Sequence, residues 1–117
     1  MKHGLLSRDI DYITQALRQF SEIEVALVFG SRAKGNYARG SDVDLAIKGP
    51  GITHATVSRL LFLLNEEYPL PYFFDVVHYE ALTNLDLVAH IDRVGEIVYE
   101  HIPSQMVELP GNVLEMR

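Results

Sequence analysis

The chain has 117 residues and a mass of 13.2 kDa, the size of one domain with a single core. No apolar run reaches the ~18 residues of a membrane span, and no charged-then-apolar leader opens the chain. We therefore expect neither a membrane segment nor a secretory signal. Because the chain has no cysteine, disulfides and thiolate chemistry are excluded, and we expect a cytoplasmic protein.

The net charge of −6 argues against wholesale nucleic-acid binding, which normally shows as a basic domain. Positive charge is nevertheless concentrated in residues 32–39, which hold three of the ten Lys and Arg residues: Arg32, Lys34 and Arg39. A local basic loop on an acidic body suits a nucleoside triphosphate better than a polynucleotide. The plainer alternative is a solvated loop with ordinary surface charge.

The first half of the chain predicts a helix and two strands. Ser7 is a candidate N-cap for a helix over about 8–20, where apolar residues recur at helical spacing. Val25–Phe29 is a short β-rich run that ends at Gly30. Asp42–Lys48 alternates polar and apolar residues, as a half-buried strand does.

The second half predicts two helices and two strands. These elements are a helix from about Thr53 to Tyr68, a strand over Tyr72–Tyr79, a helix capped by Asn84 and stopped by Gly95, and a strand over Glu96–Glu100. The alternation predicts an α/β (α+β) domain over 1–101, a two-layer fold with a small mixed sheet packed with helices. Residues 102–117 have no clear period and are expected to form a flexible or docking tail.

A loop motif between the first two strands suits phosphoryl chemistry. Gly30 lets the backbone approach a phosphate closely, and Ser31 adds a hydroxyl at a helix start, where free N–H groups favour anions. After ten residues come Asp42 and Asp44, which on a strand would point to one face, roughly 7 Å apart. That spacing suits carboxylates that share divalent metals about 3.5–4 Å apart.

Asp75 is the candidate third carboxylate. It interrupts an aromatic and β-branched strand, where an unpaired buried charge would cost several kcal/mol. A metal shared with Asp42 and Asp44 would offset that cost. The alternative interpretation of Asp75 is a capped or salt-bridged aspartate on the strand. Arg32 and Lys34 could neutralise phosphate charge or could simply face solvent.

The five histidines, His3, His54, His78, His90 and His101, have no zinc-type spacing. We therefore expect no zinc site, and we assign none of these histidines to the chemistry.

Gly30-Ser31, the ten-residue gap and Asp42-x-Asp44 together resemble the signature of the minimal nucleotidyltransferases. These are the smallest members of the DNA polymerase β-like superfamily, and they often act as the antitoxin or partner of a HEPN-domain protein. The resemblance runs from the first helix to about Glu100 and implies the nucleotidyltransferase fold. It also implies that the third acidic residue, here Asp75, acts as metal ligand and general base.

The function expected from these observations is transfer of a nucleoside monophosphate from ATP to an acceptor hydroxyl with two magnesium ions. Gly30, Ser31, Arg32 and Lys34 would hold the triphosphate, and Asp42, Asp44 and Asp75 would bind the metal. The resemblance implies that the acceptor is a tyrosine of a HEPN toxin, as for a protein adenylyltransferase.

Two other interpretations stay open. One is a non-catalytic antitoxin or accessory subunit that occludes a HEPN-type partner. The other is an antibiotic nucleotidyltransferase, which is disfavoured because 117 residues leave no room for a drug-holding domain. The apolar residues of 102–117 suggest docking on a second subunit, either another copy of the chain or a HEPN-type protein.

Overall fold

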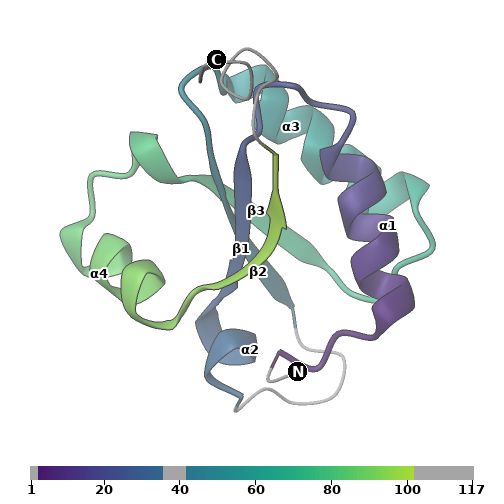
Figure 1. Ribbon diagram of the computed structural model, residues 1–117, viewed down its shortest axis with the longest axis horizontal. Helices are drawn as coiled ribbons and strands as arrows, with labels where there is room; N and C mark the ends of the chain where they lie inside the picture. Colours follow the sequence, from purple (N-terminus) through teal and green to yellow (C-terminus); the bar gives the residue numbers. More distant parts are fainter. Residues whose placement is uncertain (1–2, 36–41, 102–117) are drawn as a thin grey trace, which may run out of the picture.

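The computed structural model describes residues 3–35 and 42–101 of the chain (Figure 1). The helices are α1 (Ser7–Leu17), α2 (Gly30–Lys34), α3 (His54–Phe62) and α4 (Leu85–Val94). The strands are β1 (Val25–Phe29), β2 (Val43–Lys48), β3 (Phe74–His78) and β4 (Glu96–Glu100). A π-helical turn, Leu63–Glu67, extends α3, and a short 3-10 turn, Tyr79–Ala81, follows β3. The later part of the predicted basic loop, with Arg39, and the predicted tail 102–117 lie outside the described residues.

The four strands form one mixed sheet in the order β3-β2-β1-β4. The central strand β1 is antiparallel to both β2 and β4, whereas β2 and β3 are parallel. Two pairs of this register position the candidate site: Phe29 pairs with Asp44, and Asp44 pairs with Asp75. The predicted mixed sheet carrying helices is therefore confirmed.

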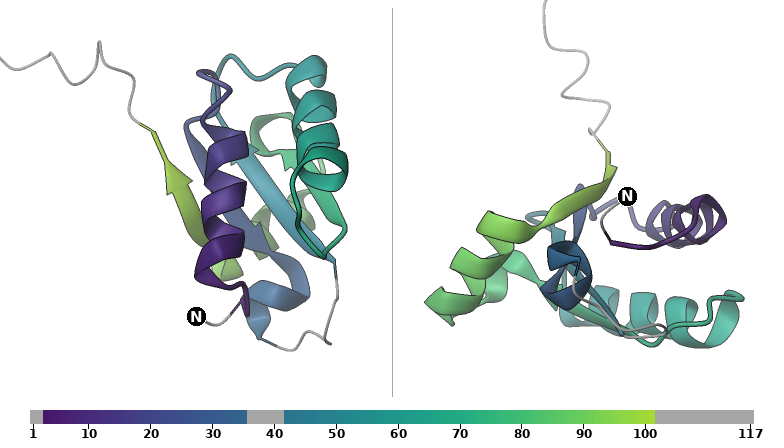
Figure 2. Two further views of the ribbon diagram at one scale, coloured as in Figure 1. Left: turned by 90° about the vertical axis from the view of Figure 1, so that its right-hand side faces the viewer. Right: turned by 90° about the horizontal axis from the view of Figure 1, so that it is seen from below.

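Helices cover both faces of the sheet, and the two faces differ in their cores. The larger core joins α1 and α3 to alternate residues of the strands, among them Val28, Leu45 and Val76. On the opposite face α4 contributes Ile91 to a small cluster with Leu27, Phe29 and Ala46. Figure 2 shows α4 on one side of the sheet and α1 and α3 on the other. Strand alternation assigns Asp44, two positions from Ala46, to the α4 face.

Local capping chemistry explains two predicted helix starts and corrects a third. Thr53 accepts the backbone N–H of Thr56 at 3.3 Å, and Asn84 accepts those of Asp86 and Leu87 at 3.0 and 3.2 Å. The predicted cap Ser7 is wrong, because the N-cap of α1 is Leu6. Its N–H donates to the buried carboxylate of Asp9 at 3.0 Å, so an acidic residue in the first turn replaces the hydroxyl cap.

None of the helices in the described part of the chain has the length and apolar character needed to cross a bilayer.

Candidate active site

The three candidate carboxylates lie at one end of the sheet, on two neighbouring strands. Asp44 is the second residue of β2, and Asp42 directly precedes that strand. Asp75 is the second residue of β3 and lies beside Asp44 in the parallel register. Asp42 and Asp75 are exposed and Asp44 is half-buried. The structure therefore brings acidic residues of two neighbouring strands to one solvent-accessible end of the sheet.

The Gly-Ser turn lies directly against this end of the sheet. Gly30 has a left-handed backbone, with φ of 74°, which disfavours residues with a side chain. A Cβ added there would overlap the Oδ2 oxygen of Asp44. The close approach of backbone and carboxylate therefore requires glycine at this position, and it places Ser31 at the same end of the sheet.

The pKa of Asp44 reports the electrostatic environment at this end of the sheet. Burial raises the pKa of Asp44, and the negative charges of Asp75 and Asp42 raise it further. A positive charge on His90 would act in the opposite direction and lower the pKa of Asp44. Asp42 and Asp75 are therefore close enough to Asp44 for their negative charges to act on its carboxylate.

The chemistry of this donor set fits a divalent cation. Carboxylate oxygens are the ligands that magnesium prefers, and a cation would relieve the repulsion that raises the pKa of Asp44. The geometry is less complete. Within residues 3–35 and 42–101, no group of three His, Cys, Asp or Glu side chains is arranged so that it could hold one ion.

The basic residues of the motif separate into one buried and one exposed side chain. Lys34 is exposed at the end of α2. Arg32 is only 2% exposed. Its Nη1 donates to the backbone carbonyl of His3 at 2.9 Å, and its guanidinium lies 4.7 Å from the centroid of the Tyr72 ring.

Arg32 belongs to a buried polar network that ties four segments together. The Tyr72 hydroxyl donates to Asp9 at 2.7 Å, and Asp9 also accepts the Leu6 N–H that starts α1. The network thus connects α2 to the N-terminal segment, α1 and the chain before β3. The expectation that Arg32 binds phosphate stays a prediction, and its burial favours support of the turn instead.

His90 is the site residue that sequence reasoning missed. It lies on α4, and its Nε2 accepts the backbone N–H of Gly30 at 3.2 Å. Its ring packs edge-on against Phe29, with centroids 6.1 Å apart and planes at 77°. No local pattern signals this contact, because 60 positions separate the two residues and only the packing of α4 brings them together.

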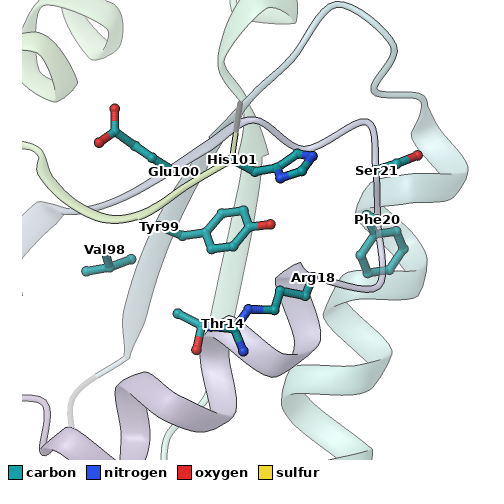
Figure 3. Close-up of a pocket in the computed structure, with 8 residues that line it drawn as sticks. All are labelled: Thr14, Arg18, Phe20, Ser21, Val98, Tyr99, Glu100 and His101. Carbon is teal, nitrogen blue, oxygen red and sulfur yellow. The ribbon is translucent and has the colours of Figure 1, made fainter. Parts of the chain in front are cut away.

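A cavity of about 570 Å³ opens at the opposite end of β1, between α1 and β4. Figure 3 shows Arg18 and Tyr99 extending into it from opposite sides, whereas the carboxylate of Glu100 points away from both. Because Glu100 pairs with Val25 and Asp44 pairs with Phe29, this cavity lies a strand's length from the carboxylates. It is separate from the candidate active site.

Comparison with known proteins identifies the family of the chain. Residues 11–103 match the family described as polymerase beta, nucleotidyltransferase. The chain belongs to this nucleotidyltransferase family. The match spans α1 to the last strand and so includes the Gly-Ser turn and all three carboxylates. No curated protein matches the chain.

Solved structures of similar fold come from toxin–antitoxin complexes. A toxin–antitoxin structure with AMP-PNP aligns with a TM-score of 0.66 at 19% identity, over 84% of this chain and 78% of that chain. A structure of a tri-AMPylated Shewanella oneidensis HEPN toxin in complex with its MNT antitoxin aligns with a TM-score of 0.63 at 18% identity, over 93% and 79%. A MntA–HepT toxin–antitoxin structure gives 0.63 at 18% identity, over 89% and 79%.

At these identities the structural matches show a shared fold. The nucleotidyltransferase fold expected from the Gly-Ser and Asp-x-Asp signature is thereby confirmed, and this nucleotidyltransferase has the architecture found in the MNT antitoxin complexes.

Proposed function

We propose that this protein transfers a nucleoside monophosphate from ATP to a hydroxyl group of a protein partner. The observation that supports the proposal most directly is the contact between Gly30 and the Asp44 carboxylate, with Asp75 next to it in register. This contact joins a backbone turn suited to phosphate with acidic residues suited to cations. Family membership supports the reaction class, and the AMP-PNP complex of a neighbour supports an adenine nucleotide as donor.

In the proposed reaction the acceptor oxygen attacks the α-phosphorus of ATP. The new phosphorus–oxygen bond forms as the bond to the bridging oxygen breaks, and pyrophosphate leaves. Gly30, Ser31 and Lys34 would hold the triphosphate. Asp75, whose carboxylate is exposed, would take the proton of the acceptor hydroxyl.

Asp42, Asp44 and Asp75 would hold divalent cations, with magnesium as the expected metal. When bound, the cations would supply neutralisation of phosphate charge, which is the largest demand of this chemistry. Within the chain itself, Lys34 would contribute in the same sense from the end of α2.

The proposed acceptor is a tyrosine of a HEPN-type toxin, in which case the chain acts as the antitoxin of the pair. The support is the tri-AMPylated HEPN toxin found with an MNT antitoxin of the same fold. The alternative is that the chain only binds and occludes such a partner. The MntA–HepT complex of the same fold supports assembly, and this alternative predicts assembly without transfer.

The test uses ATP labelled at either the α- or the γ-phosphate, with magnesium and the protein that co-purifies with this chain. Transfer of the α-label to the partner, without the γ-label, is the expected result. The variants Asp42→Ala/Asp44→Ala and Asp75→Asn should reduce labelling to background, whereas Asp11→Asn, at an exposed position on α1, should label normally.

A stable complex with no α-label under any metal would support occlusion and contradict transfer. Label that depends on the γ-phosphate alone would show a kinase and overturn the proposed reaction. Calorimetric titration of the Asp42→Ala/Asp44→Ala variant with ATP and magnesium checks the ligands separately. Unchanged affinity there would remove these carboxylates from the metal site.

A further inference from the structure

The Gly-Ser turn is held from outside by a side chain of α4. The backbone N–H of Gly30 donates to Nε2 of His90 at 3.2 Å. For Nε2 to accept, the imidazole must be neutral with its proton on Nδ1. The ring is fixed on a second side by its edge-on contact with Phe29, the residue that precedes the turn. One histidine therefore contacts two consecutive residues of the β1–α2 junction.

The surroundings of this junction leave its backbone little room to change conformation. Gly30 is in the left-handed region at φ of 74°, and its Cα side is filled by the Asp44 carboxylate. Glycine is also the residue with the widest choice of backbone conformations, so nothing in its own chemistry selects this one. A turn that must stay in one conformation beside a charged side chain needs an external constraint, and the bond from His90 supplies it.

We propose that His90 is a positioning residue of the nucleotide site. By accepting the Gly30 N–H, it fixes the turn that clears the Asp44 carboxylate and presents Ser31 to the triphosphate. This inference rests on the proposed function, because it assigns His90 a role in ATP binding. It also has a consequence of its own: the Gly30 N–H is already bonded to His90, so Gly30 would serve the triphosphate through the close approach of its backbone and not through that N–H.

The competing explanation is that His90 merely fills space between α4 and β1. Two substitutions at the same position separate the explanations. His90→Phe keeps a ring against Phe29 and removes the acceptor. His90→Gln removes the ring and can place an amide oxygen near the former Nε2, so it restores the acceptor. Packing alone predicts that Phe is tolerated and Gln is not, and the positioning role predicts the reverse for ATP binding.

The first measurement needs no nucleotide. In labelled parent protein, NMR should detect a through-hydrogen-bond coupling between the Gly30 amide nitrogen and His90 Nε2. The Gly30 amide should exchange with solvent faster in His90→Phe than in the parent, and near the parent rate in His90→Gln. Absence of the coupling, together with equal exchange in all three proteins, would overturn the inference.

The second measurement is calorimetric titration with ATP and magnesium. We expect His90→Phe to bind on the order of tenfold more weakly, the effect of one hydrogen bond with some accompanying disorder. His90→Gln should stay within about threefold of the parent. His54→Phe, the same change at an exposed histidine at the start of α3, is the matched control and should bind as the parent does.

The two proposals fail in different ways. If the parent binds no ATP, the proposed function is wrong, and the role of His90 in the nucleotide site is wrong with it. If the parent binds ATP and His90→Phe binds equally well, only the inference about His90 is wrong. A His90→Phe protein with the parent's melting temperature and weaker ATP binding would be the result that supports it.

Discussion

The two faces of the sheet are built from the same strands but differ in how many apolar side chains they bury. The face toward α1 and α3 buries sixteen apolar side chains of the described residues, whereas the face toward α4 buries four. In β2 the division is between adjacent residues: Val43 and Leu45 are fully buried on the first face, and Asp44 between them is half-buried on the second.

Polar groups differ between the faces as well. In the network on the α1 side, Asp9 and Arg32 are almost fully buried, and each has hydrogen-bond partners within the protein. On the α4 side, Asp44 has a raised pKa and like charges beside it. Buried polar groups are tolerated when they are bonded, whereas repulsion that persists in a folded protein is typical of a functional site. The larger apolar core and the repelling carboxylates of the candidate site therefore lie on opposite faces of one sheet.

The largest effect should come from the stabilising face. Leu45→Ala removes a side chain with no exposed surface from the larger core and leaves a cavity. We expect the free energy of unfolding to fall by about 2–5 kcal/mol. Chemical denaturation measures it. A loss below about 1 kcal/mol would mean that this face is not the main source of stability.

The buried network gives the next largest effect. Tyr72→Phe keeps the ring beneath the Arg32 guanidinium but removes the hydroxyl that donates to Asp9 at 2.7 Å. In this variant Asp9 still accepts the Leu6 N–H but loses the hydrogen bond from Tyr72. We therefore expect the free energy of unfolding to fall by about 1–3 kcal/mol.

The matched control for that change is Tyr68→Phe, whose hydroxyl accepts from Gln19 at an exposed position. It should change stability by less than about 0.5 kcal/mol. Equal losses for both tyrosines would show that the network contributes nothing beyond ordinary surface bonding.

Sequence patterns predicted the elements of this fold well because their signals are local. The Thr53 and Asn84 caps lie next to the helices that they start, and the alternation of β2 is visible in six residues. Ser7 failed as a cap for a reason that is also local: the charged Asp9 carboxylate accepts the Leu6 N–H, so the helix begins one residue earlier and Ser7 lies inside its first turn.

The site could be predicted only where its residues are close in sequence. The Gly-Ser turn and Asp42-x-Asp44 form one continuous motif, and Asp75 was recognisable as a charge in an apolar strand. His90 could not be found, because its role depends on α4 crossing to the second face. The burial of Arg32 was equally hidden, since its partners His3 and Tyr72 are distant in the chain.

The third prediction concerns Asp44, the neighbour of Leu45 that points to the other face. Its pKa in the folded protein is raised above the ordinary value of 3.8, so ionisation opposes folding. The parent should therefore lose stability as the pH rises from that value through the raised one. Asp44→Asn lacks this loss and, in chelator at neutral pH, should melt no lower than the parent.

Thermal melts of both proteins from acidic to neutral pH, with chelator present, test this expectation. The difference between them should shrink as the pH falls below the ordinary aspartate range, because Asp44 is then protonated in both states. Asp11→Asn, at an exposed site on α1, should follow the parent. A lower melting temperature for Asp44→Asn at neutral pH would make Asp44 a structural partner and would weaken the contrast between the faces.

The smallest effect is expected at Lys34, which is exposed at the end of α2. Lys34→Ala should weaken ATP binding by about two- to fivefold, on the scale of 1 kcal/mol for an exposed ion pair. The free energy of unfolding of Lys34→Ala should stay within about 0.5 kcal/mol of the parent's, because the side chain is exposed. Lys48 is the matched cation. It is the last residue of β2, far from Asp44 at the start of that strand, and its ammonium lies 4.3 Å from the Tyr79 ring centroid. Lys48→Ala should show the reverse pattern, with parent-like ATP binding and a stability loss of about 0.5–1 kcal/mol. Equal effects of the two substitutions on ATP binding, measured by titration at one ionic strength, would show that only the overall charge of the protein matters.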